Sequence, residues 1–119
     1  MEAAARGARQ AGGIVIGILP GTDRATANRF VDISIAAGSG HARNLAVVGT
    51  ADGVIAIGGA GGTLSEIGFA LALGRPLVVL GGWRLEHHDP AMPIPPTVAD
   101  PADAVEWIWN HLSLVQSTG

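Results

Sequence analysis

The residues with the clearest chemical potential lie in one glycine-rich segment, Ile57–Glu66, which reads IGGAGGTLSE. It joins the apolar run Val54–Ile57 to a stretch with the character of a helix. Glycines at the end of a strand can adopt left-handed conformations and let a ligand approach the main chain without meeting a Cβ atom. The unpaired N–H groups and positive dipole end of the following helix stabilise an anion. The segment therefore predicts a site for a small phosphorylated ligand, with candidate residues Gly58, Gly59, Gly61, Gly62 and Thr63.

The same segment could instead be a tight connection between strand and helix that binds nothing. More glycines precede Thr63 than such a turn requires, and ligands of open α/β sheets lie outside the carboxyl ends of the strands. An anion or nucleotide site is therefore favoured over an empty turn. The spacing does not match G-x-G-x-x-G, because Leu64 stands in the third glycine's place, so an NAD site is only weakly indicated.

Glu66 and Arg43 are the charged residues of most interest. Thr63-Leu64-Ser65-Glu66 matches a capping box, in which Thr63 is the N-cap and Glu66 occupies N3, and from the residues alone this structural role is favoured for Glu66. Arg43 falls in the first turn of a predicted helix, where a cation is unfavourable by itself. A positive charge there suits a phosphate or an anionic leaving group. His87, His88 and Asp89 are adjacent on a proline-rich loop and their side chains diverge, so no metal site is predicted.

The elements that must position these residues alternate between helices and short apolar strands. Continuous apolar runs indicate strands that are covered on both faces, so the pattern predicts an α/β, doubly wound and mostly parallel sheet of Rossmann type. The last helix has Asp100 as its N-cap and Val105, Ile108 and Leu112 as its inner stripe. The other predicted elements are a helix over Glu2–Gln10, a buried strand over Ile14–Leu19, an extended segment over Phe30–Ile35, a helix over His41–Thr50 buried through Leu45, Val47 and Val48, a strand over Val54–Ile57, a helix over Thr63–Leu73 capped by Gly74, a strand over Leu77–Leu80 and a loop over Trp83–Pro96.

Composition limits the classes of function. With 119 residues, of which 48% are hydrophobic and 14% charged, we expect a single domain and a homo-oligomer, dimeric or higher, that covers part of the apolar surface. The formal charge of −3 predicts no nucleic-acid or membrane partner, and the absence of a long apolar run predicts a soluble, cytoplasmic protein. All seven basic residues are arginines, which excludes a pyridoxal-phosphate enzyme and a P-loop, since both need a lysine.

The segment IGGAGGTLSE resembles the Gly-Gly-x-Gly-Thr-x-x-Glu motif of the LOG-like Rossmann family (the SLOG superfamily), with Gly62, Thr63 and Glu66 in place. That family includes nucleotide phosphoribohydrolases, molybdenum cofactor carrier proteins and proteins often mislabelled lysine decarboxylases. ILPG, which contains Pro20 and Gly21, is similar to its strand-end loop, and HARN lies where the hydrolases carry His-x-Arg-Lys. Family members have a strand-helix-strand unit before this point. We therefore expect residues 1–119 to form a single Rossmann-like nucleotide-binding domain that is truncated at its N-terminus.

Two functions follow from the resemblance. The alanine and doubled glycine of the motif look more like the carrier branch, which implies binding of a phosphorylated nucleotide-like or pterin ligand, with the molybdenum cofactor or a nucleotide as candidates and no pyridoxal phosphate. The alternative is a nucleoside 5′-monophosphate phosphoribohydrolase in which Glu66 and Arg43 are catalytic. Pro20, Gly21 and Asn44 would join the ligand site. Asn44 stands where the hydrolases have lysine, which favours the carrier.

Overall fold

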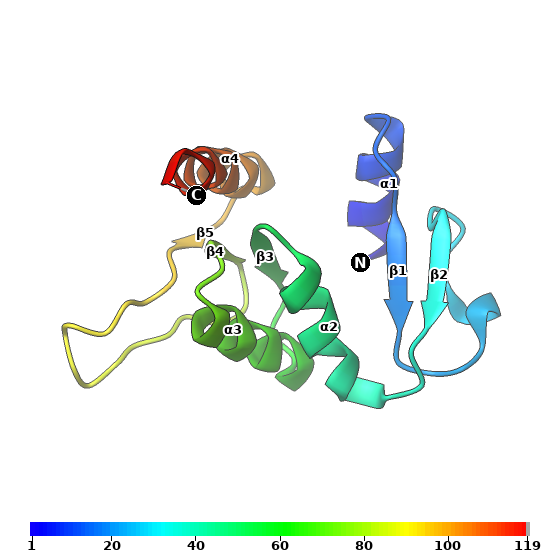
Figure 1. Ribbon diagram of the computed structural model, residues 1–119, viewed down its shortest axis with the longest axis horizontal. Helices are drawn as coiled ribbons and strands as arrows, with labels where there is room; N and C mark the ends of the chain where they lie inside the picture. The colour runs from blue at the N-terminus through cyan, green and yellow to red at the C-terminus, as the bar shows by residue number, and fades with distance from the viewer. Residues whose placement is uncertain (119) are drawn as a thin grey trace. The chain divides into compact units, whose positions relative to one another are not determined.

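The computed structural model describes residues 1–118, and the side chains of residues 1–112. The chain divides into two units, Met1–Arg43 and a second that begins at Asn44. Both units combine helices with parallel strands, so the predicted α/β class is confirmed (Figure 1). The elements in chain order are α1 (Glu2–Gln10), β1 (Ile16–Leu19), the 3₁₀ helix η1 (Arg24–Thr26), β2 (Ile33–Ala36), the 3₁₀ helix η2 (Gly40–Ala42), α2 (Arg43–Thr50), β3 (Val54–Ile57), α3 (Gly61–Leu73), β4 (Leu77–Leu80), β5 (Thr97–Val98) and α4 (Pro101–Thr118).

The first unit holds α1 and the parallel pair β1–β2, whose register runs from Ile16 opposite Ile33 to Leu19 opposite Ala36. Asp32 anchors the start of this pair, because its carboxylate accepts a hydrogen bond from the Val15 amide at 2.7 Å. The predicted buried strand is shorter than expected and lies nearer the surface. Its first predicted residue, Ile14, precedes the strand and is 75% exposed, and Ile16 is 56% exposed, so the prediction of full burial is wrong here.

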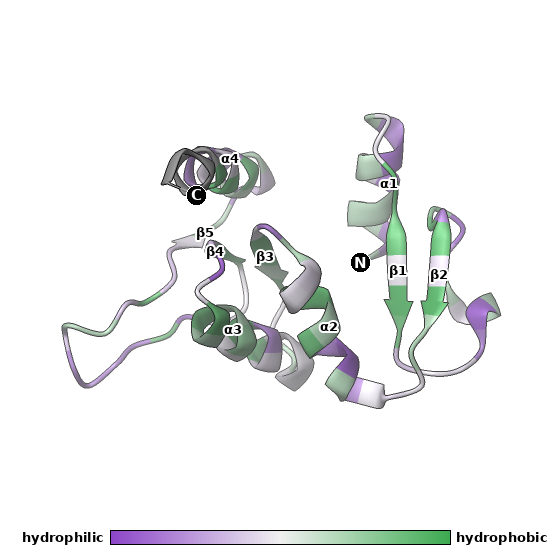
Figure 2. Cartoon of the chain, in the orientation of Figure 1, coloured by the Kyte–Doolittle hydropathy of each residue, from purple (hydrophilic) through white to green (hydrophobic). Residues whose placement is uncertain are grey.

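The second unit holds the three-stranded parallel sheet β3–β4–β5. Figure 1 shows α3 and α4 on opposite sides of this sheet, the arrangement that a doubly wound domain requires. The central strand, β4, is the most deeply buried, with Val78 at 0% exposure. Figure 2 shows the C-terminal part of α3 in green, as hydrophobic, whereas purple and white residues lie toward its start. A continuous apolar run therefore predicted the central strand correctly, because both of its faces are covered.

Two predicted helix faces need correction. In α2 the side chain of Val48 is fully buried but Leu45 is 47% exposed, and the buried position one turn before Val48 is held by Asn44. In α4 the buried residue is Ala104, whereas Val105 is 59% exposed. Ala104, Ile108 and Leu112 form the inner row at a spacing of four. Gly53 is part of this packing, since a Cβ atom there would lie 2.9 Å from the Ile108 side chain.

Capping groups close several helices as the sequence suggests. Gly74 ends α3 with φ of 67°, and the Asp100 carboxylate accepts a hydrogen bond from the Ala102 amide at 2.8 Å at the start of α4. Arg75 closes the end of α2, because its guanidinium donates to the Gly49 carbonyl at 2.9 Å. Within residues 1–118 no helix is long and apolar enough to cross a bilayer.

Candidate functional site

The glycine-rich segment forms the connection from the carboxyl end of β3 into α3. Gly58 has φ of 95°, a left-handed conformation that a side chain would strain. A Cβ atom added at Gly58 or at Gly61 would meet no atom within 4 Å. Space therefore stays open beside the main chain, as a site that is approached by a ligand requires. We call residues Gly58–Thr63 the glycine turn.

Helix α3 begins at Gly61, two residues earlier than predicted, and its N-cap is Ala60. Thr63 is thus the third helical residue and Glu66 the sixth, so the capping-box interpretation is wrong. The physical reason is that Gly61 and Gly62 themselves take up helical positions. The methyl group of Ala60 cannot accept a hydrogen bond, and Thr63 directs its hydroxyl at the Ile57 carbonyl at a distance of 3.4 Å. Glu66 lies half-buried in the second turn.

A second glycine pair, at the end of β4, supports the glycine turn from the neighbouring strand. Gly81 and Gly82 have φ of 66° and 74°. The two connections approach so closely that a Cβ atom on Gly82 would lie 2.1 Å from the Gly58 carbonyl oxygen. Trp83 follows directly, and its indole N–H donates to the Ala60 carbonyl at 3.2 Å. The segment after β4 therefore packs directly against the segment after β3, through Gly82 and the Trp83 hydrogen bond.

Asn44 contacts α3 from α2. It is 1% exposed. Its amide nitrogen donates to the Gly62 carbonyl at 3.1 Å and to the Ser65 hydroxyl at 2.9 Å. Ser65 in turn donates to the Gly62 carbonyl at 2.7 Å. Asn44 is thus held against the first turn of α3, and its carbonyl oxygen is buried with no hydrogen-bond partner among the described residues.

The other predicted residues belong to the first unit, at the end of β1. Arg43 donates from its guanidinium to the Ile18 carbonyl at 2.8 Å, and its Nε is buried with no partner in the described part of the chain. Pro20 and Gly21 follow β1 and accept backbone hydrogen bonds from Gly40 and Gly38, each at 3.0 Å. The structure thus brings the predicted residues together in two groups, one at the end of β1 and one at the glycine turn.

The histidine-containing loop after β4 forms a local turn. The imidazole Nδ1 of His87 accepts a hydrogen bond from the Asp89 amide at 2.9 Å. Within residues 1–118 no group of three or more His, Asp or Glu side chains is arranged to hold a metal ion.

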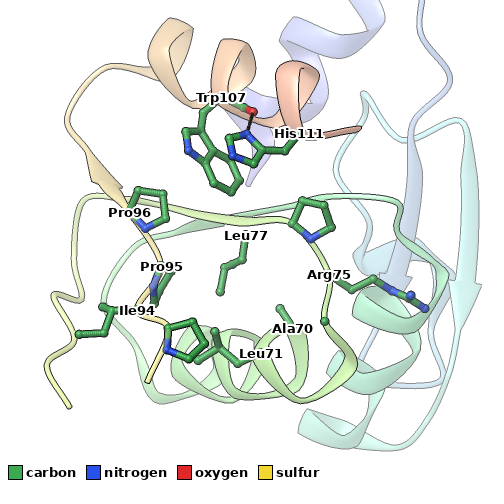
Figure 3. Close-up of a pocket in the computed structure, with 12 residues that line it drawn as sticks. Ala70, Leu71, Arg75, Leu77, Ile94, Pro95, Pro96, Trp107 and His111 are labelled. Carbon is green, nitrogen blue, oxygen red and sulfur yellow. Dashed lines mark hydrogen bonds between the residues drawn. The ribbon is translucent and has the colours of Figure 1, made fainter. Parts of the chain in front are cut away.

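An apolar pocket of about 360 Å³, which the sequence did not predict, lies at the other edge of the sheet, where β4 begins (Figure 3). Its most regular feature is a stacked pair on α4, Trp107 and His111, with ring centroids 3.6 Å apart. The His111 Nδ1 lies 2.7 Å from the Trp107 carbonyl oxygen. The wall is completed by Ala70, Leu71, Gly74, Arg75, Pro76, Leu77, Pro93, Ile94, Pro95 and Pro96.

Comparison with known proteins gives the same fold and the same family. The chain is 45% identical over 91 residues to an uncharacterized protein of Archaeoglobus fulgidus, and this match takes in 71% of the chain but 60% of the relative's length. A molybdenum cofactor binding protein from the phototrophic bacterium Rippkaea orientalis has a similar structure, with a TM-score of 0.76 and 32% identity over 92% of this chain and 69% of that one.

A second solved structure, that of TM1055, gives a TM-score of 0.74 with 31% identity over 89% of this chain and 69% of its own. The resemblance to LOG-like Rossmann proteins, inferred from IGGAGGTLSE, is thus confirmed. The family model of the SLOG cluster4 family matches residues 1–98. The chain is therefore a member of the SLOG cluster4 family.

Proposed function

We propose that this chain binds a phosphorylated ligand at the glycine turn and acts as a carrier of a pterin or nucleotide-like molecule rather than as a hydrolase. The observation that carries the proposal is the open main chain of the turn. A Cβ atom at Gly58 or Gly61 would meet nothing within 4 Å, and this opening lies at the start of a helix of 13 residues.

Main-chain groups supply the attraction for phosphate. In an α-helix the first N–H groups have no intrahelical acceptor, so those of Gly61, Gly62 and Thr63 are available to an anion. The helix dipole adds about 0.3–1 kcal/mol to the binding of a negative charge at such an end. Hydrogen bonds from main-chain N–H groups to a charged oxygen are stronger than those to a neutral one. Both the helix dipole and the charged hydrogen bonds therefore favour a phosphate group over a neutral ligand.

The likeness to a molybdenum cofactor binding protein supports a pterin as one candidate ligand. The glycine turn fits the phosphate of such a molecule because no Cβ atom fills the approach to its amides. Here this chain's residues would bind and orient the ligand through Gly61, Gly62 and Thr63. Any redox chemistry would belong to the bound cofactor.

A nucleoside 5′-monophosphate phosphoribohydrolase is the second candidate, because Glu66 lies half-buried in the second turn of α3, close in sequence to the glycine turn. A carboxylate there could stabilise an oxocarbenium-like state or activate water. Asn44 argues against this reaction. It occupies the place of the hydrolases' lysine and its amide is already engaged by Gly62 and Ser65.

Calorimetric titration with inorganic phosphate, AMP and adenosine tests the binding site. We expect phosphate and AMP to bind and adenosine not to. Gly61→Val should raise the Kd of phosphate tenfold or more, because the side chain enters the open space beside the amides. Gly68→Val is the matched control in the same helix, where a Cβ atom also meets nothing within 4 Å. Equal Kd values for phosphate in the two variants would contradict the proposed site.

Incubation with AMP separates the carrier from the hydrolase. We expect AMP to remain intact, with no free adenine on chromatography. Glu66→Gln removes the charge and keeps the size of the side chain, so it should reduce ligand affinity about tenfold if the carboxylate contacts the ligand. Release of adenine by the parent, lost in Glu66→Gln, would instead establish the hydrolase.

A further inference from the structure

The first turn of α3 is held at two of its carbonyl oxygens by side chains from outside the helix. The Ala60 carbonyl accepts the helical bond from the Leu64 amide at 3.2 Å and a second bond from the Trp83 indole, also at 3.2 Å. Asn44 donates to the Gly62 carbonyl at 3.1 Å. Ser65 donates a further bond to the Gly62 carbonyl at 2.7 Å. The Asn44 and Trp83 bonds come from two different elements, α2 and the segment after β4, so each holds the turn independently of the other.

Each of these carbonyls belongs to a peptide unit that also carries an anion-binding amide. The peptide bond is planar, so the C=O of one residue and the N–H of the next point in opposite directions from one rigid plane. The Trp83 bond, added to the helical bond from Leu64, therefore restricts the N–H of Gly61 further, and the Asn44 bond to the Gly62 carbonyl restricts the N–H of Thr63. A hydrogen bond to the carbonyl also polarises the same peptide and strengthens its N–H as a donor.

The orientation of the Asn44 amide follows from its partners. The Gly62 carbonyl can only accept, so the NH₂ group must face it, and the Asn44 oxygen is left buried without a partner among residues 1–118. A buried unsatisfied oxygen is unfavourable. Leucine would fill a similar volume without that penalty. Asparagine therefore differs from leucine at this position in one useful respect, because its NH₂ group donates a hydrogen bond to the Gly62 carbonyl.

We propose that Asn44 and Trp83 are positioning residues that preorganise the amides of Thr63 and Gly61 for phosphate. This inference depends on the proposed function. A turn rich in glycine has many accessible conformations, and ordering it on binding would weaken affinity. The two anchors order the turn before the ligand arrives. Asn44 thus acts through the main chain rather than by touching the ligand, which gives a role to the residue that replaces the hydrolases' lysine.

The test uses Asn44→Leu and Trp83→Phe in the full chain, with inorganic phosphate as the probe. Each variant should raise the Kd of phosphate about tenfold. Val78→Ala is the control, because Val78 is fully buried in β4 and its truncation lowers stability without touching the turn. The control should melt earlier than the parent and bind phosphate as the parent does. Unchanged affinity in folded Asn44→Leu would overturn the role of Asn44. Should that variant fail to fold, unchanged affinity in Trp83→Phe overturns the proposal.

Backbone ¹⁵N relaxation separates this inference from the proposed function, because it needs no ligand. Asn44→Leu should lower the order parameter of the Thr63 amide and leave that of Gly61 unchanged, whereas Trp83→Phe should do the reverse. A general loss of stability would lower both together and would refute the anchoring. If the parent binds no phosphate but the crossed pattern appears, the proposed function fails and the anchoring of the turn stands.

Discussion

The two ends of the β3–β4–β5 sheet present different surfaces, one of exposed main chain and one of side chains. At the carboxyl end of β3 the surface is main chain, exposed by glycines and held by a few side-chain hydrogen bonds. Where β4 begins, the pocket is walled by prolines, aliphatic side chains and the Trp107–His111 stack. The first edge offers directed N–H groups and suits an anion. The second offers mainly apolar side-chain area, so the chemistry of an edge depends on whether side chains cover it.

The difference also concerns tolerance to change. The glycine turn requires that nearby positions lack side chains, because a Cβ atom at Gly82 would collide with the Gly58 carbonyl oxygen. The pocket is instead formed by many side chains, so the loss of one of them leaves the rest of the wall in place. We therefore expect substitutions at the two edges to differ in size and in which property they change.

Gly82→Ala should have the largest effect. The new Cβ would lie 2.1 Å from the Gly58 carbonyl oxygen and would sit on a backbone with φ of 74°. Removing this overlap requires the ends of β3 and β4 to separate, so we expect a loss of about 3 kcal/mol or more in unfolding free energy, together with loss of phosphate binding. Urea denaturation and titration would measure the two properties. A stable variant that binds phosphate normally would show that the two connections need not touch.

Trp107→Leu should have an intermediate effect confined to stability. It removes the stack on His111 and part of the pocket wall, which we expect to lower the unfolding free energy by about 1–2 kcal/mol. Trp109→Leu is the matched control, because Trp109 is 70% exposed on the same helix. Both variants should bind phosphate as the parent does. Weaker phosphate binding in Trp107→Leu alone would show that the two edges are coupled.

Asp100→Ala should have the smallest effect. It removes the carboxylate that accepts the Ala102 amide at 2.8 Å, a loss of about 1 kcal/mol for an N-cap. The change lies at the start of α4, so the Kd of phosphate should not change. Asp100→Asn keeps an acceptor and should recover most of the stability in thermal melts. A loss that asparagine does not recover would mean that the charge, rather than the cap, stabilises this helix.

Much of the second unit could be predicted from local patterns. Strands β3 and β4 begin and end at the predicted residues, since continuous apolar runs between glycines leave few alternatives. The Asp100 cap and the Gly74 terminus were predicted for the same local reason. The start of α3 was missed because Thr63 looked like an N-cap, although the preceding glycines continue the helix. The fold class and the glycine turn were thus accessible from sequence.

What was missed depends on contacts between distant residues. Strand β5 has two residues and follows a proline-rich loop, so only pairing with β4 defines it. The burial of Asn44 needs the distant Gly62 and Ser65, and its polar character had suggested a role at the ligand instead. The pocket likewise combines α3, α4 and the loop before β5. A signal for Asn44 was present, since a polar residue at the spacing of Val48 interrupts an apolar helix face.

The bond between the Trp83 indole and the Ala60 carbonyl gives the glycine turn an optical reporter. Indole emission responds to the field at its N–H group, so an anion bound beside Ala60 should shift the emission of Trp83. Trp107 lies against an imidazole ring and Trp109 is mostly in solvent, so their emission should respond little to events at the turn. With Trp107 and Trp109 both replaced by phenylalanine, Trp83 is the remaining tryptophan, and its fluorescence would report ligand binding at the turn in real time.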